Sequence, residues 1–162
     1  MTGPGPGARP ARSGPEGEPW VLAWLRELKP ASVLDVGPGS GAYGHLVRKY
    51  LPGTQLTAVE ARGSHVEQFG LRDVYDEVLV ADVRTAGLPP VDVVVLAGVL
   101  ERTAEGEAAE LWGRARKAAR QAVFLAVPAG DWPHRQVLAV FDGILGFEAG
   151  REAGVYLGGG SG

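Results

Sequence analysis

The chain has 162 residues, carries a formal net charge of −3 and contains no cysteine. A length of about 100–200 residues is typical of one domain, and a chain of this size can bury a core without cross-links. The lack of cysteine excludes disulfides, thiolate metal ligands and a cysteine nucleophile. The balanced charge argues against a nucleic-acid partner, and no apolar run reaches the roughly 20 residues that a membrane span needs. We therefore expect a soluble cytoplasmic protein.

Glycine is over-represented, with 25 residues, and part of the excess lies near the two ends of the chain. Residues 1–18 are rich in Gly and Pro and poor in apolar side chains, so we expect a disordered tail there rather than a secretory signal. Residues 158–162 are expected to form a second flexible end. The folded domain is predicted to span residues 19–157.

Hydrophobic periodicity predicts alternating helices and strands along this domain. In chain order, we predict helix 20–28, strand 32–36, helix 42–51, strand 54–60, helix 64–69, strand 77–82, strand 91–97, helix 103–120, strand 122–127, helix 133–145, and a closing hairpin of strands 147–151 and 155–157 around Gly154. Thr103 is the predicted cap of the longest helix. The alternation indicates an α/β fold with a doubly wound, mostly parallel, Rossmann-like sheet and a C-terminal antiparallel hairpin.

Ligands of such sheets bind outside the carboxyl ends of the strands, so the residues at those ends are candidates for a site. The first strand leads into a loop with glycines at positions 37, 39 and 41, which allow close backbone approach and positive φ. The second strand ends in Glu60, whose carboxylate suits a ribose diol. The third ends in Asp82, which suits an exocyclic amine such as that of adenine. The three ends together predict a pocket for an adenosine that carries a further polar group.

Two types of cofactor fit this layout. The run Gly39-Ser-Gly41-Ala-Tyr-Gly44 matches the G-x-G-x-x-G pattern of dinucleotide sites, with Glu60 about 20 residues further on. Three features argue against a dinucleotide, and one is Asp82, an adenine-side acceptor that this pattern does not require. Asp35 places a negative charge where a pyrophosphate would lie, and the additional Gly37 makes the loop longer than that pattern requires.

The segment Val33-Leu-Asp35-Val-Gly37-Pro-Gly39-Ser-Gly41 resembles motif I of the class I S-adenosylmethionine (SAM)-dependent methyltransferases, and residues 95–102 resemble that family's fourth-strand segment. The similarity covers most of residues 19–157. It implies that SAM is the cofactor, with its methionine end over the glycine loop, and that Asp35 orients this loop. The cofactor-binding residues that the resemblance implies are Asp35, Gly37, Pro38, Gly39, Gly41, Tyr43, Glu60, Ala61, Asp82, Val83 and Ala97. Tyr43 could equally pack beneath the loop.

The resemblance is incomplete after the fourth strand. Many small-molecule members of the family have Asp-x-Leu-Glu-His there, whereas this chain has Gly98 in place of the Asp and Arg102 in place of the His. The transferred methyl group would point toward the fourth and fifth strands. Glu101, Asp131 and His134 are therefore the candidate catalytic residues, beside Trp132, and the unperturbed pKa of histidine, about 6.5, suits a base.

These observations predict a methyltransferase that acts on an O or N nucleophile of an unidentified acceptor. Two alternatives stay open: a non-catalytic SAM-binding partner protein, and an NAD-dependent oxidoreductase. We expect no resident metal, no membrane contact and no nucleic-acid partner, and the sequence leaves a homodimer open.

Overall fold

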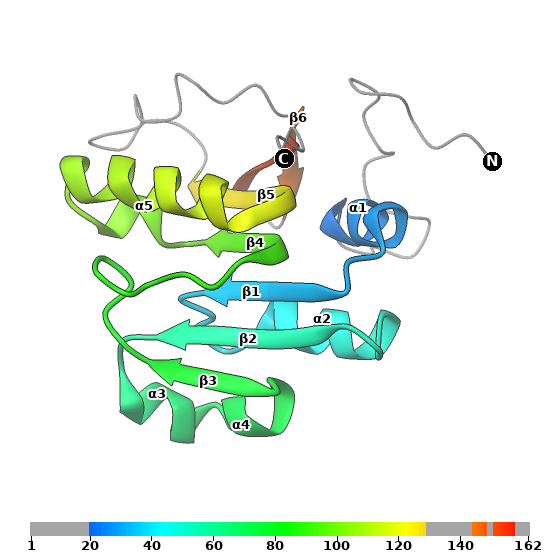
Figure 1. The fold of residues 1–162 in the computed structure, drawn as a ribbon, viewed down its shortest axis with the longest axis horizontal. Helices are drawn as coiled ribbons and strands as arrows, with labels where there is room; N and C mark the ends of the chain where they lie inside the picture. The colour runs from blue at the N-terminus through cyan, green and yellow to red at the C-terminus, as the bar shows by residue number, and fades with distance from the viewer. Residues whose placement is uncertain (1–19, 129–143, 149–150, 158–162) are drawn as a thin grey trace.

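The computed structural model describes residues 20–128, 144–148 and 151–157, and these residues form one sheet of seven strands. The strand order is β3-β2-β1-β4-β5-β7-β6 (Figure 1). Five strands run parallel: β1 (Ser32–Val36), β2 (Gln55–Glu60), β3 (Glu77–Val80), β4 (Val91–Ala97) and β5 (Ala119–Pro128). The pairs of β7 (Arg151–Leu157) with β5 and with β6 (Ile144–Glu148) are antiparallel. The predicted doubly wound, mostly parallel α/β sheet is confirmed.

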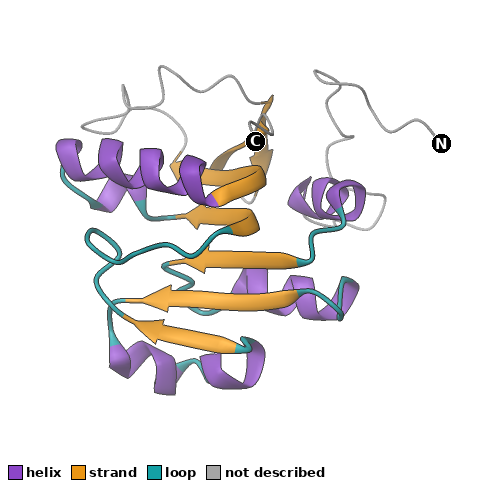
Figure 2. Cartoon of the chain, in the orientation of Figure 1, coloured by secondary structure: helices purple, strands orange, loops and turns teal. Residues whose placement is uncertain are grey.

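Helices cover both faces of the sheet (Figure 2). The described helices are α1 (Trp20–Leu28), α2 (Ala42–Tyr50), α3 (Gly63–Gln68), α4 (Leu71–Val74) and α5 (Glu105–Ala118), with a 3₁₀ turn, η1, at Leu100–Arg102. In one apolar cluster, the four helices α1, α2, α3 and α4 pack against one face of the sheet. In a second cluster, α5 and η1 pack against the other face. None of the helices among the described residues has the length and apolar character to cross a membrane.

Alternation along β1 determines which side chains meet which helices. Val33 belongs to the cluster beneath α1–α4, whereas Leu34 and Val36 belong to the cluster beneath α5. Successive strand side chains point to opposite faces, so Asp35 points to the same face as Val33. Glu60 likewise shares the face of Ala58, which is in the α1–α4 cluster. The two acids therefore lie on one face of the sheet.

Helix α5 begins after Ala104, so the prediction that Thr103 is its cap was wrong. The hydroxyl of Thr103 instead donates to the Leu100 carbonyl at 2.9 Å and closes the η1 turn. The Ala104 N–H donates to the Glu107 carboxylate at 3.3 Å, which satisfies one of the first-turn amides. Acidic residues in the first turn and basic residues in the last turn of α5 agree with the helix dipole.

The two C-terminal strands, β6 and β7, have other bounds than the predicted strands 147–151 and 155–157. Gly154 lies within β7 and pairs with Leu125 of β5 on one side and with Leu145 of β6 on the other. The prediction of a turn at Gly154 was therefore wrong. A glycine in a strand that is paired on both sides gives the same sequence signal as a turn glycine. Leu145 lies in β6, so the helix predicted over 133–145 extends too far, and its residues 133–143 lie outside the described residues. The predicted tails, 1–18 and 158–162, lie outside them as well.

Candidate functional site

The carboxyl ends of β1 to β4 meet at one edge of the sheet, which we call the carboxyl edge, and their opposite ends form the amino edge (Figure 1). β1 pairs with β2 on one side and β4 on the other, so the strand order reverses direction there. The crevice at such a switch point is where doubly wound sheets bind ligands. The loop of residues 37–41 lies at this point.

Three glycines of that loop adopt left-handed backbone conformations, with φ of 66° at Gly37, 56° at Gly39 and 82° at Gly41. A Cβ added at Gly37 would lie 2.8 Å from Val99 Cγ2, so this glycine is needed for packing. A Cβ added at Gly39 would meet nothing within 4 Å. The loop therefore presents backbone toward open space at Gly39, as close approach to a ligand requires.

Asp35, the residue two positions before the loop, is an acid with one unsatisfied oxygen. Its side chain is buried, and Oδ2 accepts a hydrogen bond of 2.5 Å from the hydroxyl of Tyr75. Oδ1 is buried and accepts no hydrogen bond from any described residue. Burial raises the pKa of Asp35 to about 6; the Tyr75 hydrogen bond opposes this rise, and the charge of Glu60 adds to it. A buried, mainly ionised oxygen without a donor is costly, which indicates a place for an external donor.

Tyr75, which the sequence analysis did not identify, connects Asp35 with helix α2. It follows α4, and a Cβ added at Gly44 would lie 2.5 Å from its Cζ and Oη atoms. Burial raises the pKa of Tyr75, as does Asp35, while a hydrogen bond from the Gly44 backbone lowers it. Gly44 is therefore a glycine because the Tyr75 ring lies against it, which gives the G-x-G-x-x-G match a packing explanation.

Glu60 is the second buried acid of the edge, with 6% of its surface exposed. Its Oε1 accepts the Arg62 N–H at 2.9 Å and lies 3.7 Å from His65 Nδ1. Both contacts engage Oε1, so Oε2 receives no hydrogen bond from the described residues and can accept one from a ligand. Ala61, the next predicted contact, is exposed beside it.

Asp82 is already engaged by a neighbour that the sequence analysis did not anticipate. Its Oδ1 accepts hydrogen bonds from the backbone N–H and from Nε of Arg84, each at 2.9 Å. Its Oδ2 accepts from Arg84 Nε at 3.0 Å and from Nη2 at 2.6 Å. These contacts lower the pKa of Asp82 to about 2, the side-chain bonds of Arg84 contributing most. A carboxylate offers about four acceptor positions. An adenine amine would therefore compete with Arg84.

The turn that carries Asp82 is fixed by helix α5. The guanidinium of Arg114 donates to the carbonyls of Val83, Arg84 and Ala86. Arg84 also lies 3.6 Å from Glu107 of the same helix. The position of this turn is therefore set from the opposite face of the sheet.

The remaining residues that the sequence singled out fall into three groups. Pro38, Tyr43, Val83, Ala97 and Glu101 are half-buried near the carboxyl edge, and Tyr43 packs against the α1–α4 cluster. Arg102 is exposed in η1. The candidate acceptor-site residues Asp131, Trp132 and His134 lie outside the described residues. Within the described part of the chain, no group of acids and histidines is arranged to hold a metal.

Val80 is a further residue that the sequence analysis missed. It pairs with Glu60 across β2 and β3, and 51% of its surface is exposed. A Cβ added at Gly63 would lie 3.9 Å from its Cγ1 atom. Val80 thus gives the edge an apolar surface next to a buried acid, a pairing that suits the face of a heterocyclic base. The continuous apolar run of residues 78–81 gave no signal for this exposure.

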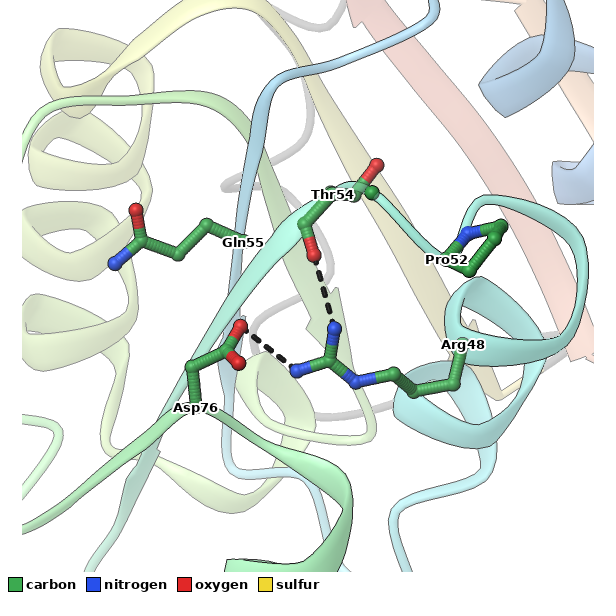
Figure 3. A pocket seen from close by; sticks show the side chains of 6 residues that line it. Arg48, Pro52, Thr54, Gln55 and Asp76 are labelled. Atoms are coloured by element: carbon green, nitrogen blue, oxygen red, sulfur yellow. Dashed lines mark hydrogen bonds and ion pairs between the residues drawn. The ribbon is translucent and has the colours of Figure 1, made fainter.

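A depression with polar walls lies at the amino edge (Figure 3). It is lined by Arg48, Pro52, Gly53, Thr54, Gln55 and Asp76. The Arg48 guanidinium donates to the carbonyls of Val74 at 2.7 Å and Thr54 at 3.1 Å, and lies 2.7 Å from Asp76 Oδ2. The charged groups of this depression are thus paired with one another, and we place the candidate ligand site at the carboxyl edge.

No family model and no curated protein matches the sequence. Solved structures match the fold. Magnesium protoporphyrin IX methyltransferase from Synechocystis PCC 6803, solved with bound SAM, is 15% identical with a TM-score of 0.67 over 86% of this chain and 76% of that one. Human N-acetylserotonin methyltransferase, in complex with SAM, is 17% identical with a TM-score of 0.64 over 86% and 53%.

The methyltransferase domain of a bacterial Hen1 is similar over a larger share of its own length. It is 17% identical, with a TM-score of 0.65 over 85% of this chain and 95% of that domain. The chain spans about half the length of the human enzyme. The fold is that of the class I SAM-dependent methyltransferases, as the resemblance at the glycine loop implies.

Proposed function

We propose that the chain binds SAM at the carboxyl edge and transfers its methyl group. The observation that carries this proposal is Asp35 Oδ1, a buried carboxylate oxygen without a donor beneath a loop of left-handed glycines. An ammonium group would supply the missing donor. The neighbouring structures solved with SAM or its product support the same choice of ligand.

The residues present at the edge fit the parts of this cofactor. Asp35 and the 37–41 loop would hold the amino-acid end, Glu60 Oε2 would accept from the ribose diol, and Val80 would lie against the base. Asp82 would accept a hydrogen bond from the exocyclic amine of adenine once Arg84 no longer occupies one of the acceptor positions on Asp82. A diol is neutral, so the negative charge of Glu60 favours it over a ribose phosphate.

SAM supplies an electrophilic methyl group on a sulfonium, which a nucleophile displaces in line. The task of the protein is to hold the acceptor near that methyl group, and such positioning can contribute about 7–11 kcal/mol of the barrier. A base adds roughly 10²–10⁴-fold where the nucleophile must lose a proton. We propose His134, Asp131 and Glu101 for that role and an oxygen or nitrogen atom as the nucleophile. Similarity to O-methyltransferases supports the oxygen.

Two findings disfavour the oxidoreductase alternative. The Asp35 carboxylate beneath the loop would repel a pyrophosphate. Gly44, the last glycine of the dinucleotide-like pattern, is accounted for by its contact with Tyr75. The remaining alternative, a SAM-binding partner without activity of its own, has the same cofactor site and is separated only by an assay of the isolated chain.

The cofactor assignment is tested by calorimetric titration of the purified chain with SAM, S-adenosylhomocysteine and NAD. We expect SAM and its product to bind and NAD not to bind. Glu60→Gln should weaken SAM binding about 10–100-fold, because it loses a charge-assisted hydrogen bond of about 1.5–3 kcal/mol. The control, Glu77→Gln, changes an exposed acid at the amino end of β3 and should leave affinity unchanged.

The activity is tested by incubating the chain alone with methyl-labelled SAM and a panel of small hydroxylated and aminated acceptors. Label transfer supports an independent enzyme. SAM binding together with no transfer, including to a cellular extract, would favour the non-catalytic alternative. Equal SAM affinity in Glu60→Gln and wild type would contradict the site itself.

A further inference from the structure

We propose that Tyr75 is a positioning residue of the cofactor site: its hydroxyl fixes Asp35 so that the second carboxylate oxygen stays directed to the ligand's ammonium group. This inference rests on the proposed SAM function and adds a residue to it. The contact spans 40 positions in the sequence. It joins the end of β1 to the segment between α4 and β3.

The geometry leaves Asp35 little freedom. Its Oδ2 receives the Tyr75 hydroxyl at 2.5 Å, a short bond between two buried groups. The hydroxyl is itself held by the backbone of Gly44, in the first turn of α2. The first-turn amides of a helix have no partner within the helix, and Gly41 provides no side-chain cap. The chain of contacts from Gly44 through Tyr75 to Asp35 therefore ties the helix, the loop and the acid together.

The same contacts determine which oxygen a ligand can reach. A carboxylate with Oδ2 bound to Tyr75 cannot rotate without breaking that bond, so Oδ1 remains the acceptor without a donor. Without the hydroxyl, the carboxyl group could rotate and would lose the hydrogen bond that favours its ionised form. Both effects would weaken the binding of an ammonium group.

Ionisable groups near Asp35 come from several elements. Glu60 of β2 raises its pKa, and Tyr75 after α4 lowers it by hydrogen bonding. His65 of α3 lies 3.7 Å from Glu60, and His45 of α2 lies near Gly41 of the loop. β4 contributes Val95 opposite Asp35, which has no charge. His65→Asn and His45→Asn therefore serve as controls for any pH dependence attributed to Asp35.

The test is the pH dependence of S-adenosylhomocysteine affinity between pH 5 and 8.5, by calorimetry, for wild type and Tyr75→Phe. Wild-type affinity should fall as the pH drops through about 6, where Asp35 takes up a proton. In Tyr75→Phe, affinity at pH 8 should fall about tenfold and the midpoint should move upward by about one pH unit. Tyr50→Phe, which changes a half-buried tyrosine at the last residue of α2, should match wild type.

A second route displaces the hydroxyl without changing Tyr75. Gly44→Ala places a Cβ 2.5 Å from Tyr75 Oη and should reproduce the shifted midpoint, whereas Gly113→Ala in α5, where a Cβ meets nothing within 4 Å, should not. In an Asp35→Asn background, Tyr75→Phe should cause no further pH shift. Carboxyl NMR titration of Asp35 in the ligand-free protein should show the same upward movement of its pKa.

Wild-type affinity and midpoint in both Tyr75→Phe and Gly44→Ala would overturn the positioning role. An equal loss in the Asp35→Asn background would overturn it too, since Tyr75 would then act independently of Asp35. Failure of the wild-type chain to bind SAM or its product would instead overturn the proposed function, and this proposal with it. The NMR titration separates the cases, because it reports the Tyr75–Asp35 coupling without a ligand.

Discussion

Asp76, in the bend before β3 at the amino edge, and Asp35, in β1 at the carboxyl edge, are the same residue type, yet their surroundings move their pKa values in opposite directions. Asp76 accepts the Leu56 N–H at 2.8 Å and pairs with Arg48, and these contacts lower its pKa. Asp35 has a buried oxygen without a donor, and burial raises its pKa to about 6. Paired acids stabilise a fold, whereas an acid kept without its full set of partners is a feature of binding sites.

The two edges differ in more than these acids. At the amino edge, Asp92 accepts from Arg120 at 2.9 Å and from the Ala31 N–H at 2.8 Å, which ties the starts of β1, β4 and β5 together. Those bonds outweigh burial and lower the pKa of Asp92. At the carboxyl edge, the loop after β1 contains three glycines in left-handed conformations. We propose that the amino edge contributes stability to the fold and that the carboxyl edge binds the ligand.

The largest expected effect comes from Asp35→Asn. It should weaken SAM binding about 100-fold, and it should raise the free energy of unfolding of the ligand-free protein at pH 7.5 by up to about 3 kcal/mol, because a shift from 3.8 to about 6 corresponds to that cost. Urea unfolding and calorimetry measure the two changes. Loss of stability together with unchanged affinity would reverse the roles of the two edges.

Arg48→Ala tests the opposite edge. It removes two hydrogen bonds to carbonyls and an ion pair, so we expect about 2–3 kcal/mol less unfolding free energy and unchanged SAM affinity. The partly exposed ion pair contributes little of that sum. An Arg48→Ala protein that is as stable as wild type but fails to bind SAM would place the ligand in the amino-edge depression of Figure 3.

The pH dependence of stability should separate the edges by sign. Asp35 has a raised pKa, so the folded state holds its proton more tightly than the unfolded state and gains stability as the pH falls from 6 toward 4. Asp92 has a lowered pKa, so its contribution is present at neutral pH and disappears as the pH falls below about 3.8. Urea titrations should therefore show the advantage of Asp35→Asn shrinking on acidification. The deficit of Asp92→Asn should persist until lower pH, and the reverse order would contradict the assignment.

The smallest effect concerns Arg84. Arg84→Gln frees acceptor positions on Asp82 while Arg114 still holds the turn, so it should improve recognition of the adenine amine a few-fold. The readout is the affinity ratio of S-adenosylhomocysteine to its inosine analogue, which lacks that amine. A falling ratio would show that Arg84 orients Asp82 for the ligand rather than competing with it.

The sequence predicted those features that local pattern determines. β1 and β4 were predicted with their observed bounds, because buried runs of Val and Leu ended by glycine have few alternatives. Helix α4 was missed because four residues give no periodicity, and Thr103 was misassigned because its hydroxyl closes η1.

The candidate site was predicted in part, and the omissions have a common cause. Asp35 and Glu60 were found because they stand at strand ends, and the structure places both on one face of the sheet. Tyr75 was missed because its partner lies 40 positions away, and Arg84 because an exposed arginine beside an acid is common on surfaces. Long-range contacts of single polar side chains have no short-range pattern that would reveal them.

Amide NMR of the labelled chain during titration with S-adenosylhomocysteine tests most directly where the ligand binds. We expect the largest shifts in the 37–41 loop, at Glu60 and Ala61, and at Val83, with little change at Arg48, Thr54 and Asp76. Shifts concentrated around Arg48 and Asp76, or no saturable shifts at millimolar ligand, would contradict a cofactor site at the carboxyl edge.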